Sequence, residues 1–166
     1  MNTIRHTSGR LLIAACLVLP LLAGCTKEEA AAPVEKAAVA VPANNDENAW
    51  NAYLTDVVTR NLGNSTTPYV YTLPAPDTAD FQGYYDRQLE KALGDVQRGI
   101  GEGYLLAFGS PDSTKSADLL VAAFEGAPPA TMKSVTVLFI GNQADEARTR
   151  AAVEPTGATY KFIQSR

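Results

Sequence analysis

The stretch Val135-Thr136-Val137-Leu138-Phe139-Ile140 is the most strongly strand-forming segment of the chain. It is rich in β-branched, aromatic and aliphatic residues, which favour strands because they pack well on a pleated surface. Upstream, Tyr104-Leu105-Leu106-Ala107-Phe108 is a continuous apolar run of strand length. Such a run is typical of a strand that is buried on both faces of a parallel sheet. These two segments predict a buried central sheet.

Weaker strand segments and helical segments alternate on either side of this pair. Strands are expected at 69–73, 104–108, 135–140 and 158–163, and helices between Asp46 and Gly63, between Asp77 and Gly99, between Asp112 and Gly126, and over 144–153. Alternation with short connections favours parallel strands joined by right-handed crossovers. We therefore predict one small α/β domain over 46–166, in which helices flank a mainly parallel four-stranded sheet. The pattern does not predict the order of the strands.

The first helical segment precedes the first strand and is amphipathic. Its apolar residues recur at spacings of three and four, and they are Trp50, Tyr53, Leu54, Val57, Val58 and Leu62. Trp50 is the only tryptophan in the chain. One interpretation is that Trp50 packs this helix onto the domain, and the other is that the helix docks a partner.

The N-terminal region has the organisation of a secretory signal. Arg5 and Arg10 precede an apolar run over 11–23, which is shorter than the roughly 20 residues that a spanning helix needs. The run ends in Leu21-Leu22-Ala23-Gly24-Cys25. This sequence resembles the lipobox of bacterial lipoproteins. The resemblance implies cleavage before Cys25, a diacylglycerol thioether on its sulfur, and acylation of its new amino group by a fatty acid such as palmitate.

The lipoprotein resemblance also implies a location. Aspartate directly after the lipidated cysteine usually marks retention in the inner membrane, and this chain has Thr26 instead. We therefore expect an outer-membrane lipoprotein whose domain faces the periplasm. Several acyl chains, at about 0.8 kcal/mol per buried methylene, make such an anchor effectively permanent.

Removal of residues 1–24 would narrow the chemistry that is open to the mature chain. It would remove Cys16 and the sole histidine, His6, while Cys25 would be lipidated. This excludes a Ser-His-Asp triad, a Cys-His pair and thiolate or imidazole metal sites, so we expect no cofactor and no metal. The full chain has a formal net charge of −4, and the cleavage also removes Arg5 and Arg10. An acidic chain of this kind is not expected to bind nucleic acid.

Residues 25–45 predict a tether between the lipid and the domain. After Cys25 the segment consists mainly of Ala, Pro, Glu and Lys, with three valines as its largest apolar residues. Such a composition cannot bury enough apolar surface to offset the entropy of ordering, so we expect disorder. The root-mean-square reach of such a segment is about 25 Å.

Two turns follow the central strands at the edge where ligands bind in open parallel sheets. They are Gly109-Ser110-Pro111-Asp112-Ser113-Thr114-Lys115 and Gly141-Asn142-Gln143-Ala144-Asp145. The possible ligand- or partner-binding residues in these turns are Ser110, Asp112, Ser113, Lys115, Asn142, Gln143 and Asp145. The simpler interpretation is that Asp112, Ser113 and Asp145 cap helices or lie in their first turns. Neither turn matches a phosphate-binding loop or a dinucleotide fingerprint.

Tyrosines provide a second candidate surface. Tyr69 and Tyr71 are two residues apart on one expected strand, so they face the same side, and Tyr84 and Tyr85 lie on the following helix. Aromatic rings with a polar tip can bind a sugar or a peptide. The alternative is ordinary half-buried packing.

These observations predict a non-catalytic binding or accessory module for an envelope protein or the cell wall, and no catalytic residue. Two alternatives use the crevice at the strand ends: a small carboxylate-dependent hydrolase or isomerase, and a solute-binding module. An enzyme or a solute binder requires a concave pocket with convergent polar groups at that edge. A partner-docking protein instead predicts an exposed apolar or tyrosine-rich patch.

Overall fold

The computed structural model describes residues 36–165. Its helices and strands follow in the order α1 (Glu47–Asn61), β1 (Thr67–Tyr71), α2 (Phe81–Arg98), β2 (Tyr104–Gly109), α3 (Ser113–Phe124), β3 (Thr136–Gly141), α4 (Gln143–Val153), a 3-10 turn (Glu154–Thr156) and β4 (Thr159–Gln164). The expected signal peptide, the lipidated Cys25 and the tether before residue 36 lie outside the described residues. No helix within 36–165 combines the length and the apolar character that a bilayer crossing requires.

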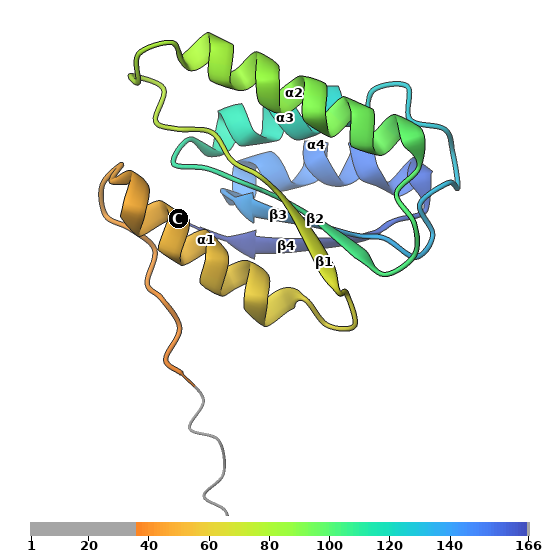
Figure 1. Cartoon of the computed structure of the whole chain (residues 1–166), viewed down its shortest axis with the longest axis horizontal. Coiled ribbons are helices and arrows are strands. Elements are labelled where there is room, and N and C mark those ends of the chain that lie inside the picture. Colours follow the sequence, from red (N-terminus) through yellow and green to blue (C-terminus); the bar gives the residue numbers. More distant parts are fainter. Residues whose placement is uncertain (1–35, 166) are drawn as a thin grey trace, which may run out of the picture. The chain divides into compact units, whose positions relative to one another are not determined.

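The four strands form one sheet in the order β1-β2-β3-β4, and every neighbouring pair is parallel. The predicted α/β domain with a parallel four-stranded sheet is therefore confirmed. Right-handed crossovers that all step to the next strand in the same direction place their helices on one face of the sheet. Helices α2, α3 and α4 therefore cover the same face. Figure 1 shows these three helices together on one side of the sheet and α1 on the other.

The central strands are buried on both faces, as their sequences predict. Leu106 and Phe108 of β2 pack with α2 and α3 on the three-helix face. The alternate residues Leu105 and Ala107 pack with α1 on the opposite face. All four side chains are fully buried. Because successive side chains of a strand point to opposite faces, a strand covered on both faces requires a continuous apolar run.

Helix α1 lies flat on the sheet through one apolar stripe. Trp50 is only 2% exposed, and Tyr53, Leu54, Val57 and Val58 are buried with it. The indole Nε1 of Trp50 donates a hydrogen bond to the Asn44 carbonyl oxygen at 2.9 Å. This packing agrees with the interpretation that Trp50 holds the helix to the domain.

Gly109 allows α1 to approach the end of β2. A Cβ atom at Gly109 would lie 2.7 Å from Leu54 Cδ2 and 3.1 Å from Ile140 Cβ, which is too close for an unshifted neighbour. Any larger residue would therefore push α1 away from the sheet.

Residues 36–45, which the sequence assigns to the tether, lie along α1, and we call this segment the strap. Its Val39 and Val41 are partly buried and pack against the apolar cluster beneath α1. The Val39 amide donates to Asp56 Oδ2 at 3.0 Å. Arg60 donates to the Lys36 carbonyl oxygen and also pairs with Asp56 at 2.8 Å. The strap thus runs antiparallel to α1, from the last turn of the helix back to its start.

Acid is expected to release the strap. The hydrogen bonds from Arg60 and from the Val39 amide lower the pKa of Asp56 below its ordinary value. A lowered folded-state pKa means that this contribution to stability is fully present above the unfolded value of about 3.9 and is lost as the pH falls through the folded value. The protection factor of the Val39 amide in hydrogen exchange should therefore fall on acidification.

The Asp56→Ala variant, which removes the acceptor of the Val39 amide, should show low protection of Val39 at every pH. Glu125→Gln, an exposed acid outside the strap, serves as the control and should behave like the unaltered protein. Protection of Val39 that is independent of pH in the unaltered protein would contradict the assignment.

Candidate functional site

The two turns predicted as a site do meet at the carboxyl edge of the sheet. Ser113 Oγ donates to Asp145 Oδ2 at 2.6 Å, and the Asn142 amide donates to Ser113 Oγ at 2.7 Å. Arg148 donates to Asp145 Oδ1 at 2.8 Å and to Asp118 Oδ1 at 2.7 Å. Both Ser113 and Asp145 are buried. Their polar atoms therefore form the hydrogen bonds that connect the start of α3 with the start of α4.

The other predicted residues of these turns have local partners. Asp112 caps α3 by accepting from the Lys115 amide at 3.0 Å, and Ser110 Oγ donates to the Asp112 carbonyl oxygen at 2.7 Å. Gln143 is exposed and donates to Glu146. Asp112 thus performs the capping role that the simpler interpretation assigns to it.

Asn142 is the exception in this network, since its buried Oδ1 has no hydrogen-bond partner in the part of the chain that is described. Its neighbour Gly141 leaves no room beside it, because a Cβ there would lie 2.4 Å from Phe139 Cζ and 2.6 Å from Ser113 Oγ. The edge formed by these two turns is therefore closely packed around Asn142.

The two predicted tyrosines of β1 differ in their surroundings. Tyr71 is completely buried, stacks on Phe108 at 4.6 Å between ring centroids, and donates to Asp95 Oδ2 at 2.8 Å. Burial, followed by the hydrogen bond to Asp95, raises the pKa of Tyr71. Tyr69 is half-buried and, with Asp95, Arg98 and Tyr104, lines a hollow of about 340 Å³. Both side chains pack on the three-helix face, and Tyr71 belongs to the core rather than to a binding surface.

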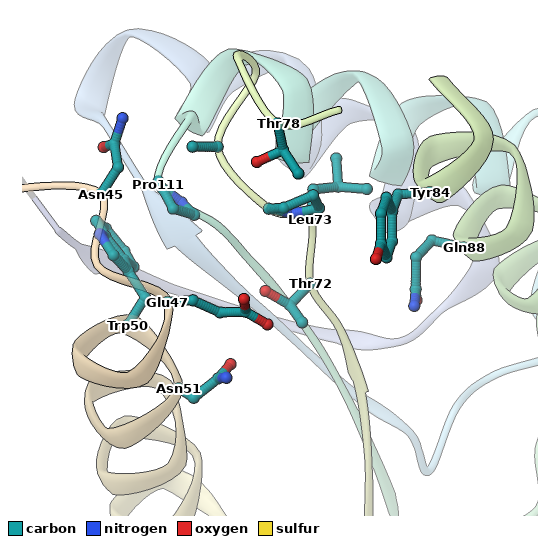
Figure 2. A pocket seen from close by; sticks show the side chains of 12 residues that line it. Asn45, Glu47, Trp50, Asn51, Thr72, Leu73, Thr78, Tyr84, Gln88 and Pro111 are labelled. Atoms are coloured by element: carbon teal, nitrogen blue, oxygen red, sulfur yellow. The ribbon is translucent and has the colours of Figure 1, made fainter. Parts of the chain in front are cut away.

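A separate cleft of about 320 Å³ lies where β1 ends, between the first turns of α1 and the start of α2. Figure 2 shows its walls. Its lining residues are Asn45, Glu47, Trp50, Asn51, Thr72, Leu73, Pro74, Ala75, Thr78, Tyr84, Gln88 and Pro111. Of the two predicted turns, only the first reaches the cleft, through Pro111.

The topology of the chain creates this cleft. Because α1 and α2 cover opposite faces of the sheet, they diverge at the end of β1 and leave a space between them (Figure 1). Pro74 and Pro76 prevent the chain from continuing as a regular strand across that space, since proline offers no amide hydrogen for the ladder. The segment between β1 and α2 therefore lies across one side of the cleft.

The start of α2 holds Tyr84 beside the cleft. Asp80 adopts a left-handed conformation with φ of 58°, which is uncommon for any residue but glycine. Its carboxylate lies over Gly83, where a Cβ would come within 2.5 Å of it. Asp80 Oδ2 also lies 3.6 Å from Arg87, and the Arg87 guanidinium sits 4.7 Å from the centre of the Tyr84 ring. Tyr84 is thus supported from the side away from the cleft.

The polar side chains of the cleft are not used by the fold. Glu47, Asn51 and Thr72 make no side-chain hydrogen bond or ion pair with any residue in the range 36–165, and the Oε1 atom of Gln88 is buried without a partner. Glu47, Asn51 and Thr72 are therefore available to a ligand, so the arrangement is suited to binding.

Comparison with family models, curated proteins and solved structures gives no match to this chain. The cleft is therefore interpreted from its own geometry.

The sequence places the predicted site residues at the carboxyl edge of the sheet, where the cleft also lies, but it does not single out the residues that line the cleft. Glu47 and Asn51 are four residues apart, so they lie on one side of α1 next to Trp50. In the sequence they look like ordinary exposed helix residues. The available signal was Pro74 and Pro76, which mark an irregular segment directly after a strand.

The Ser113–Asp145 pair is expected to be structural. Asp145→Asn removes the charged partner of Arg148, and Ser113→Ala leaves the Asn142 amide without its acceptor. Each variant should lower the free energy of unfolding by about 1–3 kcal/mol. Urea denaturation monitored by circular dichroism measures this change.

Asp112→Asn is the matched control, because asparagine caps a helix as well as aspartate does. Its stability should stay within about 0.5 kcal/mol of the unaltered protein. Equal stabilities for Asp145→Asn and Asp112→Asn would contradict the structural role of Asp145.

Proposed function

We propose that this protein is an outer-membrane lipoprotein, anchored through Cys25, whose periplasmic α/β domain is a non-catalytic binding module. Its binding site is the cleft between α1 and α2. The proposal joins the lipobox at the N-terminus to a domain with a concave polar cleft at the end of β1. The binding partner is a solute or a protruding group of an envelope component.

The observation that carries this proposal is the set of unpaired polar groups in the cleft. Glu47 and Asn51 reach it from α1, Thr72 follows β1, and Gln88 comes from α2. Figure 2 shows the Glu47 carboxylate and the Thr72 hydroxyl directed into the space between the helices, with Tyr84 and Gln88 across from them. Groups from three separate elements therefore converge without serving the fold.

The same groups favour binding over catalysis. A carboxylate-dependent hydrolase or isomerase needs a second group beside the carboxylate to act as acid, base or nucleophile. Glu47 is the only carboxylate among the residues that line the cleft. Asp145, the strongest alternative at this edge, is buried and bound to Ser113 and Arg148.

The surface favours a ligand that enters a cavity over a flat docking interface. Tyr84, at 44%, is the one large hydrophobic side chain recorded as exposed among the described residues. Large contiguous apolar patches mark many docking interfaces. The ligand is therefore proposed to be a group small enough to enter a space of about 320 Å³.

The anchor can be tested independently of the cleft. In the native host, Cys25→Ala should remove the protein from the outer-membrane fraction. The intact mass of the unaltered protein should include diacylglycerol and one further acyl chain. Recovery of the variant in the outer-membrane fraction, or an unlipidated mass for the unaltered protein, would contradict the anchor.

The binding site can be tested with a photo-crosslinker in intact cells. Asn51, which is exposed and lines the cleft, is replaced by p-benzoylphenylalanine, and Thr59, exposed on α1 outside the cleft, is replaced in a control. After irradiation, intact-mass analysis reports adducts of any size. We expect a defined adduct at position 51 and none at position 59.

Equal labelling at the two positions, or no adduct at position 51, would overturn the cleft as the binding site. Neither result would bear on the lipid anchor, which the Cys25→Ala experiment tests separately.

A further inference from the structure

We propose that the cleft recognises a protonated primary amine on an alkyl chain, with Glu47 as its counter-charge. The proposal rests on the proposed function and names the chemical class of the ligand. The amine can belong to a free small molecule or to a side chain that projects from a peptide.

The charge of the cleft selects against anions and favours a cation. Glu47 is the one acidic residue among the twelve that line it, and no Lys, Arg or His is among them. The structure records no ion pair of Glu47 with any residue between 36 and 165. A cation that enters would therefore form a charge-assisted hydrogen bond without displacing an internal partner.

The remaining polar groups match an ammonium in number and kind. An alkyl ammonium has three donors and no acceptor. The cleft offers acceptors at the Glu47 carboxylate and at the hydroxyls of Thr72 and Thr78. The two threonines are the independent observation, because they lie on the segment after β1 and line the same cleft as the Glu47 carboxylate of α1.

The apolar part of the cleft provides contacts for the carbon chain of the amine. Leu73, Pro74, Ala75 and Pro111 contribute aliphatic surface beside the polar groups. Tyr84 adds an aromatic ring, which can contact both methylene groups and a cation. An alkyl ammonium combines the two properties that these walls offer.

A first-turn acid on a helix is common, because it interacts favourably with the helix dipole. That effect accounts for an acid at the start of α1. It does not account for the hydroxyls of Thr72 and Thr78, which come from the segment after β1 and line the same cleft.

The test uses the mature lipidated protein in detergent micelles and three probes with four-carbon chains and different head groups: n-butylammonium chloride, n-butanol and sodium butyrate. Binding is followed through the backbone amide shifts of Thr72 and Gln88 in nuclear magnetic resonance titrations. We expect saturable shifts with butylammonium, at least tenfold weaker binding of butanol, and no binding of butyrate.

Charge-neutral variants separate the local effect of Glu47 from the net charge of the protein. Glu47→Gln should weaken butylammonium binding at least tenfold. Glu90→Gln removes the same charge from an exposed position of α2 outside the cleft and should leave the affinity unchanged. Unchanged stability of both variants in urea denaturation shows that neither has unfolded.

The outcomes distinguish this inference from the proposed function. If butanol binds as tightly as butylammonium, or if Glu47→Gln keeps full affinity, the ammonium inference is wrong, while the cleft remains a binding site. If no probe shifts the amides of Thr72 or Gln88, the inference is also wrong, and the crosslinking at position 51 then shows whether the cleft is a binding site.

The source of the amine is identified by two further probes. Tighter binding of cadaverine than of Nα-acetyl-lysine methylamide supports a free diamine, and the reverse order supports a lysine-like side chain on a peptide. Failure of both to bind more tightly than n-butanol would overturn the inference.

Discussion

The structure depends on the burial of β2 and β3 on both faces. The consecutive strand order places all three crossover helices on one face, so no crossover can cover the other face. Helix α1, with Val39 and Val41 of the strap beside it, packs against the cluster of Leu105, Ala107, Leu138 and Ile140. Exposure of apolar surface to water costs about 25 cal/mol per Å². Loss of α1 would therefore expose the apolar side chains of this face and destabilise the domain. The position of α1 is therefore set by the sheet, although α1 precedes it in the chain.

The same constraint explains where the cleft lies. Helix α1 covers one face of the sheet and α2 covers the other. The two helices therefore lie on opposite sides of the edge strand β1. The space between them at the end of β1 is a by-product of this topology, and the chain places Glu47, Asn51, Thr72 and Gln88 around it. The neighbouring part of the same edge, around Ser113 and Asp145, also has polar residues, but these residues hydrogen-bond to one another and leave no open site there among the described residues. One edge of one sheet thus contains both a structural polar network and an open polar site.

Much of the fold could be predicted from the sequence, because each element has its own local signal. The predicted strand at 104–108 lies at Tyr104–Gly109, and the predicted helix at 144–153 lies at Gln143–Val153. The second helix starts at Phe81 rather than soon after Asp77, because the chain first makes a turn that ends in the left-handed Asp80. The strand order could not be predicted, since the same apolar periodicity fits any order. The cleft could not be predicted either, because its groups come from three distant segments and each segment alone looks like ordinary surface.

The strap gives the domain a defined path for mechanical force. Its contacts run from Lys36 at Arg60, through Val39 at Asp56, to Asn44 at Trp50. Tension on the chain from its N-terminal side is therefore resisted first at the last turns of α1. The contacts would break in sequence, and the one at Trp50, beside the cleft, would break last. In a protein held by its N-terminus, a displacement of the attachment point would first break the contacts near Lys36, while the residues around the cleft keep their positions.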